Sequence, residues 1–248
     1  MKQISDDLLR GKRILLIVAH PDDESLGAGI LLQRNPNTHV VFCTSGAPHR
    51  LSIWRRFGSP WHYARIRENE ARAALRIAGI EDFTFLRFRD GKLYRALPKL
   101  YGRLAKIVNT WKPLLIVTHA FEGGHQDHDV CSFLCARLSL SFNVPVQEMP
   151  LYRPDSGNGH LVYQTFRESN NEGELLEPTS AELQTKQKMV SAHESQGAVT
   201  SEFDVARELF RPQLRHDYQR PAAEGASKLA VSGLASDELV AAFRAFSD

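Results

Sequence analysis

The sequence predicts an α/β protein with a Rossmann-like open sheet, mostly parallel, and helices on both faces of that sheet. Three observations indicate this class. Short, continuously apolar runs have the pattern of strands that are buried on both faces. Longer segments with apolar side chains at helical spacing lie between these runs. The two kinds of segment alternate through the first half of the chain, which is typical of a parallel sheet wound with helices.

The first half of the chain supplies four strands and three helices in alternation. The expected strands are apolar runs or segments of alternating polarity at 14–19, 39–44, 83–87 and 114–118. The expected helices have apolar or alanine side chains at helical spacing and cover 26–34, 62–78 and 97–111. The handedness of crossovers and the short connections favour a Rossmann-like arrangement. If the strand order is 3-2-1-4, the first and fourth strands are neighbours.

The second half of the chain is less regular. The expected elements are helices at about 129–140, 179–193 and 237–246 and short strands near 144–148 and 160–167. We find no repeat and no linker that divides the chain. We therefore expect one domain over 1–248, with a C-terminal extension over about 198–248.

Composition excludes several classes of partner. The 248 residues include 31 Lys+Arg and 29 Asp+Glu, so the net charge is +2 and no basic field for nucleic acid is expected. The first apolar run, 14–19, is too short to cross a bilayer, so we expect no membrane span. Three cysteines without a C-x-x-C pair indicate neither a disulfide framework nor a zinc knuckle, and we expect a reducing, cytoplasmic location. A homo-oligomer is compatible with the sequence.

Two polar clusters follow two of the predicted strands directly. The segment 19–24 reads AHPDDE after the first strand, and the segment 122–129 reads EGGHQDHD after the fourth. Ligands of open α/β sheets bind beyond the carboxyl ends of the strands, where these two clusters would face each other. So many carboxylates at one sheet edge would repel one another unless a cation were present. Histidine and aspartate are also donors for divalent metals, and the sequence therefore predicts a metal site.

The same motifs resemble those of a known family. AHPDDE after the first strand and GHQDH at 124–128 are similar to the motifs of the LmbE-like deacetylases, also called the PIG-L family. The likeness covers the chain from Arg13 to about Gly197. It implies a Rossmann-like fold and zinc-dependent hydrolysis of an N-acyl group, usually the acetamide of an N-acetylglucosamine unit in a small molecule or glycoconjugate. Gln126 stands where many relatives carry proline, which leaves the metal donors unchanged.

The resemblance also implies roles for single residues. The zinc ligands would be His20, Asp23 and His128. Such donors also suit Fe²⁺ or Mn²⁺. Asp22 would be the general base that accepts a proton from water activated by the metal.

The second motif would complete this chemistry. His125 would stabilise the oxyanion, and Asp127 would orient a histidine through its far nitrogen. Structural readings of these residues stay open, because Asp22 and Asp127 could cap helices and His125 could face solvent. We expect Glu24 to be structural, and His193, on a later helix, could approach the site.

Substrate contacts are expected from two further residues and one loop. The resemblance implies that Arg67 holds a substrate hydroxyl or phosphate and that Asp90 lies near the sugar, although both could equally form surface ion pairs. The loop 48–61 is rich in arginine and tryptophan, and it could be a lid that stacks on a sugar or an interface between subunits. The expected partner is a small N-acetylated sugar.

Three other functions are alternatives to the deacetylase. An amidase of the same family could act on another N-acyl substrate or a thiol conjugate. Two histidines and one carboxylate also describe the triad of non-haem Fe(II) oxygenases, but the alternation of strands and helices disfavours their all-β scaffold. A non-catalytic module that binds a metal or a carbohydrate would leave the carboxylate beside the open metal position unexplained.

Overall fold

The computed structural model describes residues 2–3, 11–48, 55–155, 160–167, 173–222 and 236–247. The strands in these residues are β1 (Lys2–Gln3), β2 (Ile14–Val18), β3 (Thr38–Thr44), β4 (Phe83–Phe88), β5 (Leu115–His119), β6 (Val146–Met149), β7 (Tyr152–Pro154), β8 (Leu161–Tyr163), β9 (Glu174–Leu175) and β10 (Leu209–Pro212). One sheet has the order β1-β9-β10-β6-β5-β2-β3-β4, and β7 pairs with β8 in a separate hairpin. The predicted α/β class is confirmed.

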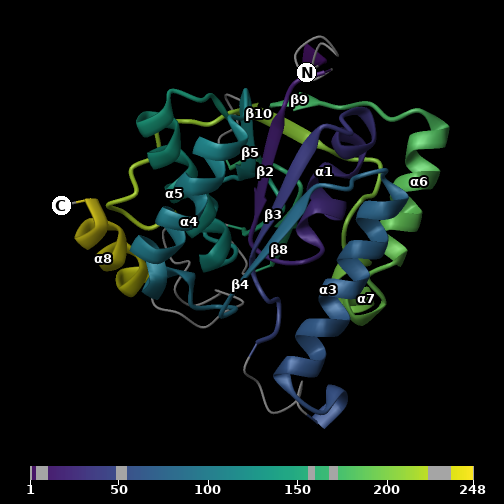
Figure 1. Ribbon diagram of the computed structural model, residues 1–248, viewed down its shortest axis with the longest axis horizontal. Coiled ribbons are helices and arrows are strands. Elements are labelled where there is room, and N and C mark those ends of the chain that lie inside the picture. The colour runs from purple at the N-terminus through teal and green to yellow at the C-terminus, as the bar shows by residue number, and fades with distance from the viewer. Residues whose placement is uncertain are drawn as a thin grey trace.

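Helices cover both faces of the main sheet. The helices in the described residues are α1 (Asp23–Arg34), α3 (Pro60–Ile77), α4 (Leu97–Trp111), α5 (Gln126–Phe142), α6 (Ser180–Ser191), α7 (Gly197–Thr200) and α8 (Ser236–Ser247), with the short 3₁₀ helices η2 (Leu93–Ala96) and η3 (Glu194–Gln196). Figure 1 shows α4, α5 and α8 on one side of the sheet and α1, α3 and α6 on the other. No helix within the described ranges is long and apolar enough to span a membrane.

Each layer of helices buries one face of the central strands. In β2, Leu15 and Ile17 belong to the core beneath α4 and α5, whereas Leu16 and Val18 belong to the core beneath α1 and α3. All four side chains are fully buried. Because successive side chains of a strand point to opposite faces, a strand covered on both sides must be apolar throughout. This explains the continuous apolar runs in the sequence.

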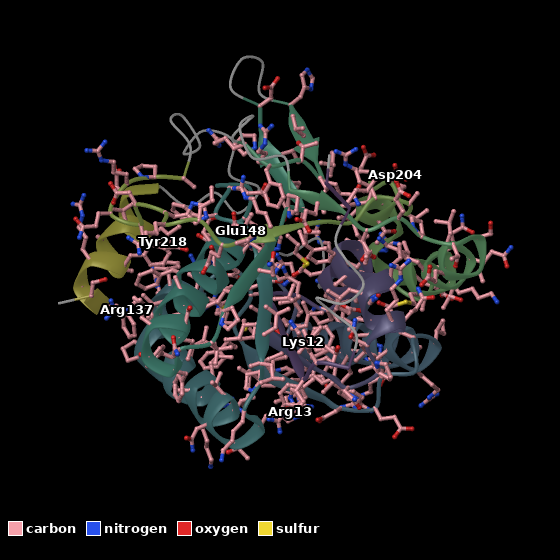
Figure 2. All side chains as sticks on the ribbon, turned by 90° about the horizontal axis from the view of Figure 1, so that it is seen from above. Lys12, Arg13, Arg137, Glu148, Asp204 and Tyr218 are labelled. Carbon is pink, nitrogen blue, oxygen red and sulfur yellow. The ribbon has the colours of Figure 1, made fainter. Side chains whose placement is uncertain are left out.

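The strand order 3-2-1-4, on which the meeting of the two polar clusters depends, is present. The strands β4-β3-β2-β5 lie in the order 3-2-1-4, and β2 pairs in parallel with β5 in the register Ile14↔Leu115 and Leu16↔Val117. The carboxyl ends of β2 and β5 therefore lie side by side. Figure 2 shows Lys12 and Arg13, which precede β2, well away from Glu148, which lies near the carboxyl end of β6.

Some elements differ from the expectation. The segment near 160–167 contributes only β8, which pairs with β7 outside the main sheet. β10 was not expected from the sequence, and it joins the main sheet antiparallel to β6. Phe243 of α8 is 1% exposed and belongs to the same core as α4 and α5. The single domain over 1–248 and the extension over 198–248 stay predictions, and α8 and β10 of that extension pack against the rest of the fold.

A buried ion pair links α6 to a break in α1. Lys186 Nζ lies 2.8 Å from the Glu208 carboxylate, and both side chains are fully buried. Ala28 interrupts α1 with non-helical backbone angles, which leaves N–H groups of the following turn without partners inside the helix. The Glu208 carboxylate accepts the N–H groups of Ile30 and Leu31 at 2.7 and 3.2 Å. Glu208 therefore caps the second half of α1 and neutralises Lys186.

Glu208→Gln is expected to destabilise the chain, because it leaves Lys186 buried without a counter-charge. The free energy of unfolding should fall by about 3–5 kcal/mol, the usual cost of breaking a buried ion pair. Urea denaturation followed by circular dichroism measures this value. Glu81→Gln, the same change at an exposed position, is the control and should alter the value by less than about 0.5 kcal/mol. Equal denaturation midpoints for the two variants would contradict the account of this ion pair.

Candidate metal centre

The two polar clusters of the sequence meet at the carboxyl ends of β2 and β5. His20 and Asp23 directly follow β2, and His128 lies in the first turn of α5, which follows β5. Nδ1 of His20 lies 3.2 Å from Nε2 of His128 and 3.3 Å from one oxygen of Asp23. The other oxygen of Asp23 lies 3.4 Å from Nε2 of His128. The three side chains that the sequence indicates as metal ligands therefore face one another.

This arrangement fits a divalent cation. Bonds of about 2.0–2.1 Å to a tetrahedral zinc ion separate its donor atoms by roughly 3.4 Å, which is close to the separations of these three donors. His20, Asp23 and His128 are all buried, with 4–7% of their surface exposed. Two imidazoles and one carboxylate are also donors that divalent metals prefer. The residues present can therefore hold a metal ion.

His119, the last residue of β5, adds a further imidazole. Its ring stacks on that of His128 with the centroids 3.9 Å apart, and its Nε2 lies 3.3 Å from Asp23. Asp23, His119 and His128 thus form a second group of metal donors. However, the N–H of Ala19 donates to Nε2 of His119 at 3.0 Å, so the lone pair that would bind a metal is occupied. Nδ1 of His20 faces Asp23 and His128 instead, and His20 is the better third ligand.

The start of α5 fixes the second motif. α5 begins three residues earlier than expected, and His125 is its N-cap. The N–H of Asp127 donates to Nδ1 of His125 at 3.1 Å, so a neutral His125 ring carries its proton on Nε2. The Asp127 carboxylate accepts the N–H groups of Gly91 and Leu93 at 2.6 and 3.1 Å. It also lies 3.5 Å from Nε2 of His20, and it thereby links the metal donors to the loop after β4.

Asp22 lies beside the donor triad, and its side chain does not cap α1. Its carboxylate is 2.8 Å from Nη2 of Arg67. The same guanidinium donates to the carbonyl oxygens of Pro21 and Gly46 at 2.7 and 2.6 Å. Gly46 has a φ of +62°, and a Cβ there would come within 2.7 Å of Arg67, so this turn requires glycine. Loss of hydration on burial raises the pKa of Asp22 to about 6, since it outweighs the opposing attraction of Arg67.

Glu24 holds the turn that carries Asp22. Asp22 has a φ of +148°, which residues other than glycine rarely adopt, and its N–H donates to Glu24 at 2.9 Å. The other oxygen of Glu24 accepts the Ser25 hydroxyl at 2.8 Å and lies 3.0 Å from Nε2 of His193. Glu24 and His193 are 0% and 1% exposed. His193 therefore reaches the site through Glu24, which anchors the first loop to the end of α6.

The charges at the centre favour a cation. Burial opposes protonation of His20, but the neighbouring carboxylates, Asp23 foremost, outweigh it and raise the pKa of His20. Burial also disfavours charge on Asp23, yet the surrounding histidines hold its pKa well below the usual value. Burial lowers the pKa of both His125 and His128 to about 4, so these two imidazoles are neutral. A bound dication would neutralise the negative charge of the same carboxylates.

The centre opens into a pocket of about 480 Å³. Asp22, Asp90 and His125 line this pocket, and Asp90 lies 3.8 Å from Nε2 of His20. Arg67 also lines it, although both of its Nη atoms are bound to the protein. His20, Asp90, His125 and Asp127 form another group of close donors. The structure thus brings all eight site residues expected from the sequence to one place.

The expected lid is only partly within the described residues, because 49–54 fall outside them. Pro48 lines the pocket. Trp61, at the start of α3, is 84% exposed and is not among the residues that line the pocket. The role of the loop 48–61 as a lid or an interface stays a prediction.

Two residues of the site were not indicated by the sequence patterns. His119 directly follows the predicted strand 114–118 and is the last residue of β5, beside β2. Its place at the carboxyl end of a strand was a usable signal. Tyr152, the first residue of β7, lines the pocket and packs against His128 with the ring centroids 5.3 Å apart. No local pattern predicts this contact, because it depends on the path of the β7–β8 hairpin.

Two curated proteins similar to this chain in sequence are named as deacetylases. A deacetylase of 1D-myo-inositol 2-acetamido-2-deoxy-alpha-D-glucopyranoside from Geodermatophilus obscurus is 26% identical over 182 residues, which cover 62% of this chain and 60% of the relative. A probable N-acetyl-alpha-D-glucosaminyl L-malate deacetylase 2 from Bacillus subtilis is 32% identical over 129 residues, 48% of this chain and 57% of the relative. The chain thus spans about 60% of the length of these relatives.

A solved structure and a family model agree with these relatives. A deacetylase of the teicoplanin biosynthetic pathway has a TM-score of 0.65 at 21% identity, over 83% of this chain and 99% of that one, which shows a shared fold. The family model described as PIG-L, GlcNAc-PI de-N-acetylase, matches residues 15–139, half of the chain and all of both metal-site motifs. The chain belongs to the PIG-L family, as its two motifs predict.

Proposed function

We propose that the chain is a zinc-dependent hydrolase that removes the N-acetyl group from an N-acetylglucosamine unit of a small molecule or glycoconjugate. The observation that carries the proposal is the approach of His20, Asp23 and His128 to within 3.2–3.4 Å of one another. Three protein donors leave a fourth position of a tetrahedral ion open, as catalytic sites require. The names of the relatives from Geodermatophilus obscurus and Bacillus subtilis support the reaction class and the sugar.

In this proposal His20, Asp23 and His128 hold the ion. Zinc, when bound, supplies a Lewis acid that makes water a nucleophile near neutral pH. Asp127 orients His20 through the nitrogen that faces away from Asp23, and the N–H groups of the loop after β4 fix Asp127 in turn. Such outer partners set the ring orientation and the basicity of a ligand.

Asp22 is the general base. Its carboxylate lines the pocket beside the three ligands, and Arg67 fixes it from the opposite side at 2.8 Å. A carboxylate held in this way accepts a proton from the attacking water and returns it to the leaving amine. Because both Nη atoms of Arg67 are used on the protein, we propose that Arg67 acts on the substrate chiefly through Asp22.

His125 stabilises the negative charge that develops on the amide oxygen. Its Nδ1 is occupied by the Asp127 N–H, so the neutral ring presents the N–H of Nε2 to the pocket, which it lines. A preorganised donor of this kind contributes about 2.7–4 kcal/mol, or 10²–10³ in rate. Asp90, on the same pocket wall, is placed to accept a hydrogen bond from a sugar hydroxyl.

A panel of acetylated compounds, scored for free amine, tests this function. The panel contains N-acetylglucosamine, its glycosides with inositol and malate, N-acetylgalactosamine, and N-acetylated amino acids and thiol conjugates. With zinc bound, we expect amine only from compounds that contain N-acetylglucosamine. Amine from the amino acids or thiol conjugates alone would favour the amidase of the same family. No amine from any compound with zinc, Fe²⁺ or Mn²⁺ would reject the hydrolase.

A further inference from the structure

Part of the pocket beside the metal centre is apolar. Its apolar and aromatic lining residues include Leu26, Tyr152, Leu161, Tyr163, Val199 and Phe203. Of these six, all except Leu26 lie outside the segment 15–139 that matches the family model, so this part of the lining comes mainly from the second half of the chain. We call Tyr152, Leu161, Tyr163, Val199 and Phe203 the aromatic wall.

One residue of the aromatic wall contacts the metal centre, and two further rings pack against that residue. Tyr152 packs edge-on against His128, with the ring centroids 5.3 Å apart. Tyr163 and Phe203 follow at 6.2 and 6.3 Å from Tyr152, and they contact each other at 5.0 Å. These distances are typical of packed aromatic pairs. A ligand whose acetamide reaches His128 would therefore extend along the three rings.

Two contacts hold the wall in place. A Cβ at Gly124 would collide with the carbonyl oxygen of Tyr152, so only glycine lets β7 approach the loop that leads into α5. The side chain of Gln164, directly after β8, donates to the carbonyl oxygens of Asp204 and Arg207 at 3.0 and 2.8 Å and accepts the Asp204 N–H at 2.8 Å. Gln164 is buried, and its bonds clamp the segment after Phe203 to the hairpin; Asp204 is labelled in Figure 2. The wall is thus formed before a ligand binds.

The chemistry of the wall points to an apolar, uncharged ligand group. The side chains of Leu161 and Val199 offer no hydrogen bond to a sugar hydroxyl, and Val199, which lines the pocket, is 46% exposed. Glu202 also lines the pocket, and its charge contributes to the raised pKa of Tyr163, behind burial. A carboxylate beside Tyr163 disfavours an anionic group at the wall, whereas the cations Arg89 and Lys92 of the lining lie in the segment after β4. The pocket of about 480 Å³ also has room for a drug-sized ligand, more than one sugar ring occupies.

We infer that the aromatic wall is a subsite for a neutral aryl or alkyl aglycone attached to the N-acetylated sugar, which makes this chain selective for hydrophobic glycosides. The inference rests on the proposed function, because that function places the acetamide at His128 and the remainder of the substrate along the wall. A second sugar ring, which aromatic side chains can also stack, is the alternative occupant.

The test compares methyl, phenyl and octyl N-acetylglucosaminides of both anomers with a disaccharide of two N-acetylglucosamine units. We expect kcat/KM for the phenyl or octyl glycoside to exceed that for the methyl glycoside about tenfold, or about 1.4 kcal/mol, mainly through KM. Calorimetry of the corresponding free-amine products, phenyl against methyl glucosaminide, measures the same preference without any chemical step.

Two variants assign the preference to the wall. Val199→Asp places a charge at an exposed position, where folding tolerates it, and Phe203→Ala removes one ring. In both variants, the ratio of kcat/KM for the phenyl glycoside to kcat/KM for the methyl glycoside should fall close to one. Leu140→Asp is the matched control, because Leu140 is 80% exposed on α5 and does not line the pocket. This control should keep the tenfold ratio.

The outcomes separate the subsite from the proposed function. A phenyl preference in product binding that Val199→Asp abolishes, without amine release from any glycoside, supports the subsite and rejects the deacetylase. Amine release from the phenyl and methyl glycosides at equal rates, together with equal affinities for their two free-amine products, supports the deacetylase and overturns the subsite. A preference for the disaccharide over the phenyl glycoside, or a phenyl preference that survives both wall variants, also overturns the subsite.

Discussion

Asp22→Asn is expected to keep the metal ion and to lose amide hydrolysis by about 10²–10⁴-fold, the share that a positioned general base supplies. Asparagine has the shape of aspartate but cannot accept the proton from water. Asp22 is not among the three donors that approach one another at 3.2–3.4 Å, so metal content should remain about one ion per chain. Steady-state amine release and metal analysis of the same sample give both values.

The control for this variant is Asp237→Asn on the surface of α8, which makes the same change at an exposed position. It should leave both turnover and metal content unaltered. If Asp22→Asn kept near-normal turnover, Asp22 would not be the base. If it lost the metal as well, the loss of activity would report on binding of the ion and not on proton transfer.

His128→Ala is expected to lose the metal ion and, with it, all metal-dependent hydrolysis. Its Nε2 faces both His20 and Asp23, so its removal takes one donor from a set of three. Loss of an outer partner of a ligand typically weakens metal binding 10–100-fold, and loss of a ligand itself should weaken it by more than about 100-fold. Competition with a metal chelator measures the affinity.

Two histidine variants make this prediction specific. His62→Ala, at an exposed position of α3, should bind metal as the unchanged chain does. His119→Ala should retain most of the affinity, because the N–H of Ala19 already occupies Nε2 of His119. If His119→Ala lost the ion while His20→Ala kept it, the metal would be held by Asp23, His119 and His128 instead. An unchanged metal affinity in His128→Ala would contradict both sets of ligands, because each set contains His128.

The adjacency of the two motifs could be predicted from the sequence alone. Alternating apolar strands and amphipathic helices dictate a parallel sheet, and the handedness of crossovers places β2 beside β5. The residues after these strands, AHPDDE and GHQDH, must then meet at the same edge. The apolar pattern of the strands and the rule for crossover handedness were sufficient for this prediction. Each strand is long enough for its continuous apolar run to indicate burial on both faces.

Contacts between distant, irregular segments could not be predicted in this way. Glu24 and His193 are 169 residues apart, and nothing in either local sequence indicates their hydrogen bond. β7 and β8 have three residues each, too few to show an alternating pattern. The sequence therefore did not predict that Tyr152 and Tyr163 of these strands pack together in the aromatic wall. The start of α5 was missed because histidine is not a preferred N-cap, yet His125 serves as one.

The most direct test of a metal centre shared by the two loops is a zinc titration of the metal-free chain, with amine release from an N-acetylglucosaminide as the signal. We expect no release without metal, a rise in proportion to added zinc, and a plateau at about one ion per chain. Release by the chelated, metal-free chain at the rate of the loaded chain would contradict the account.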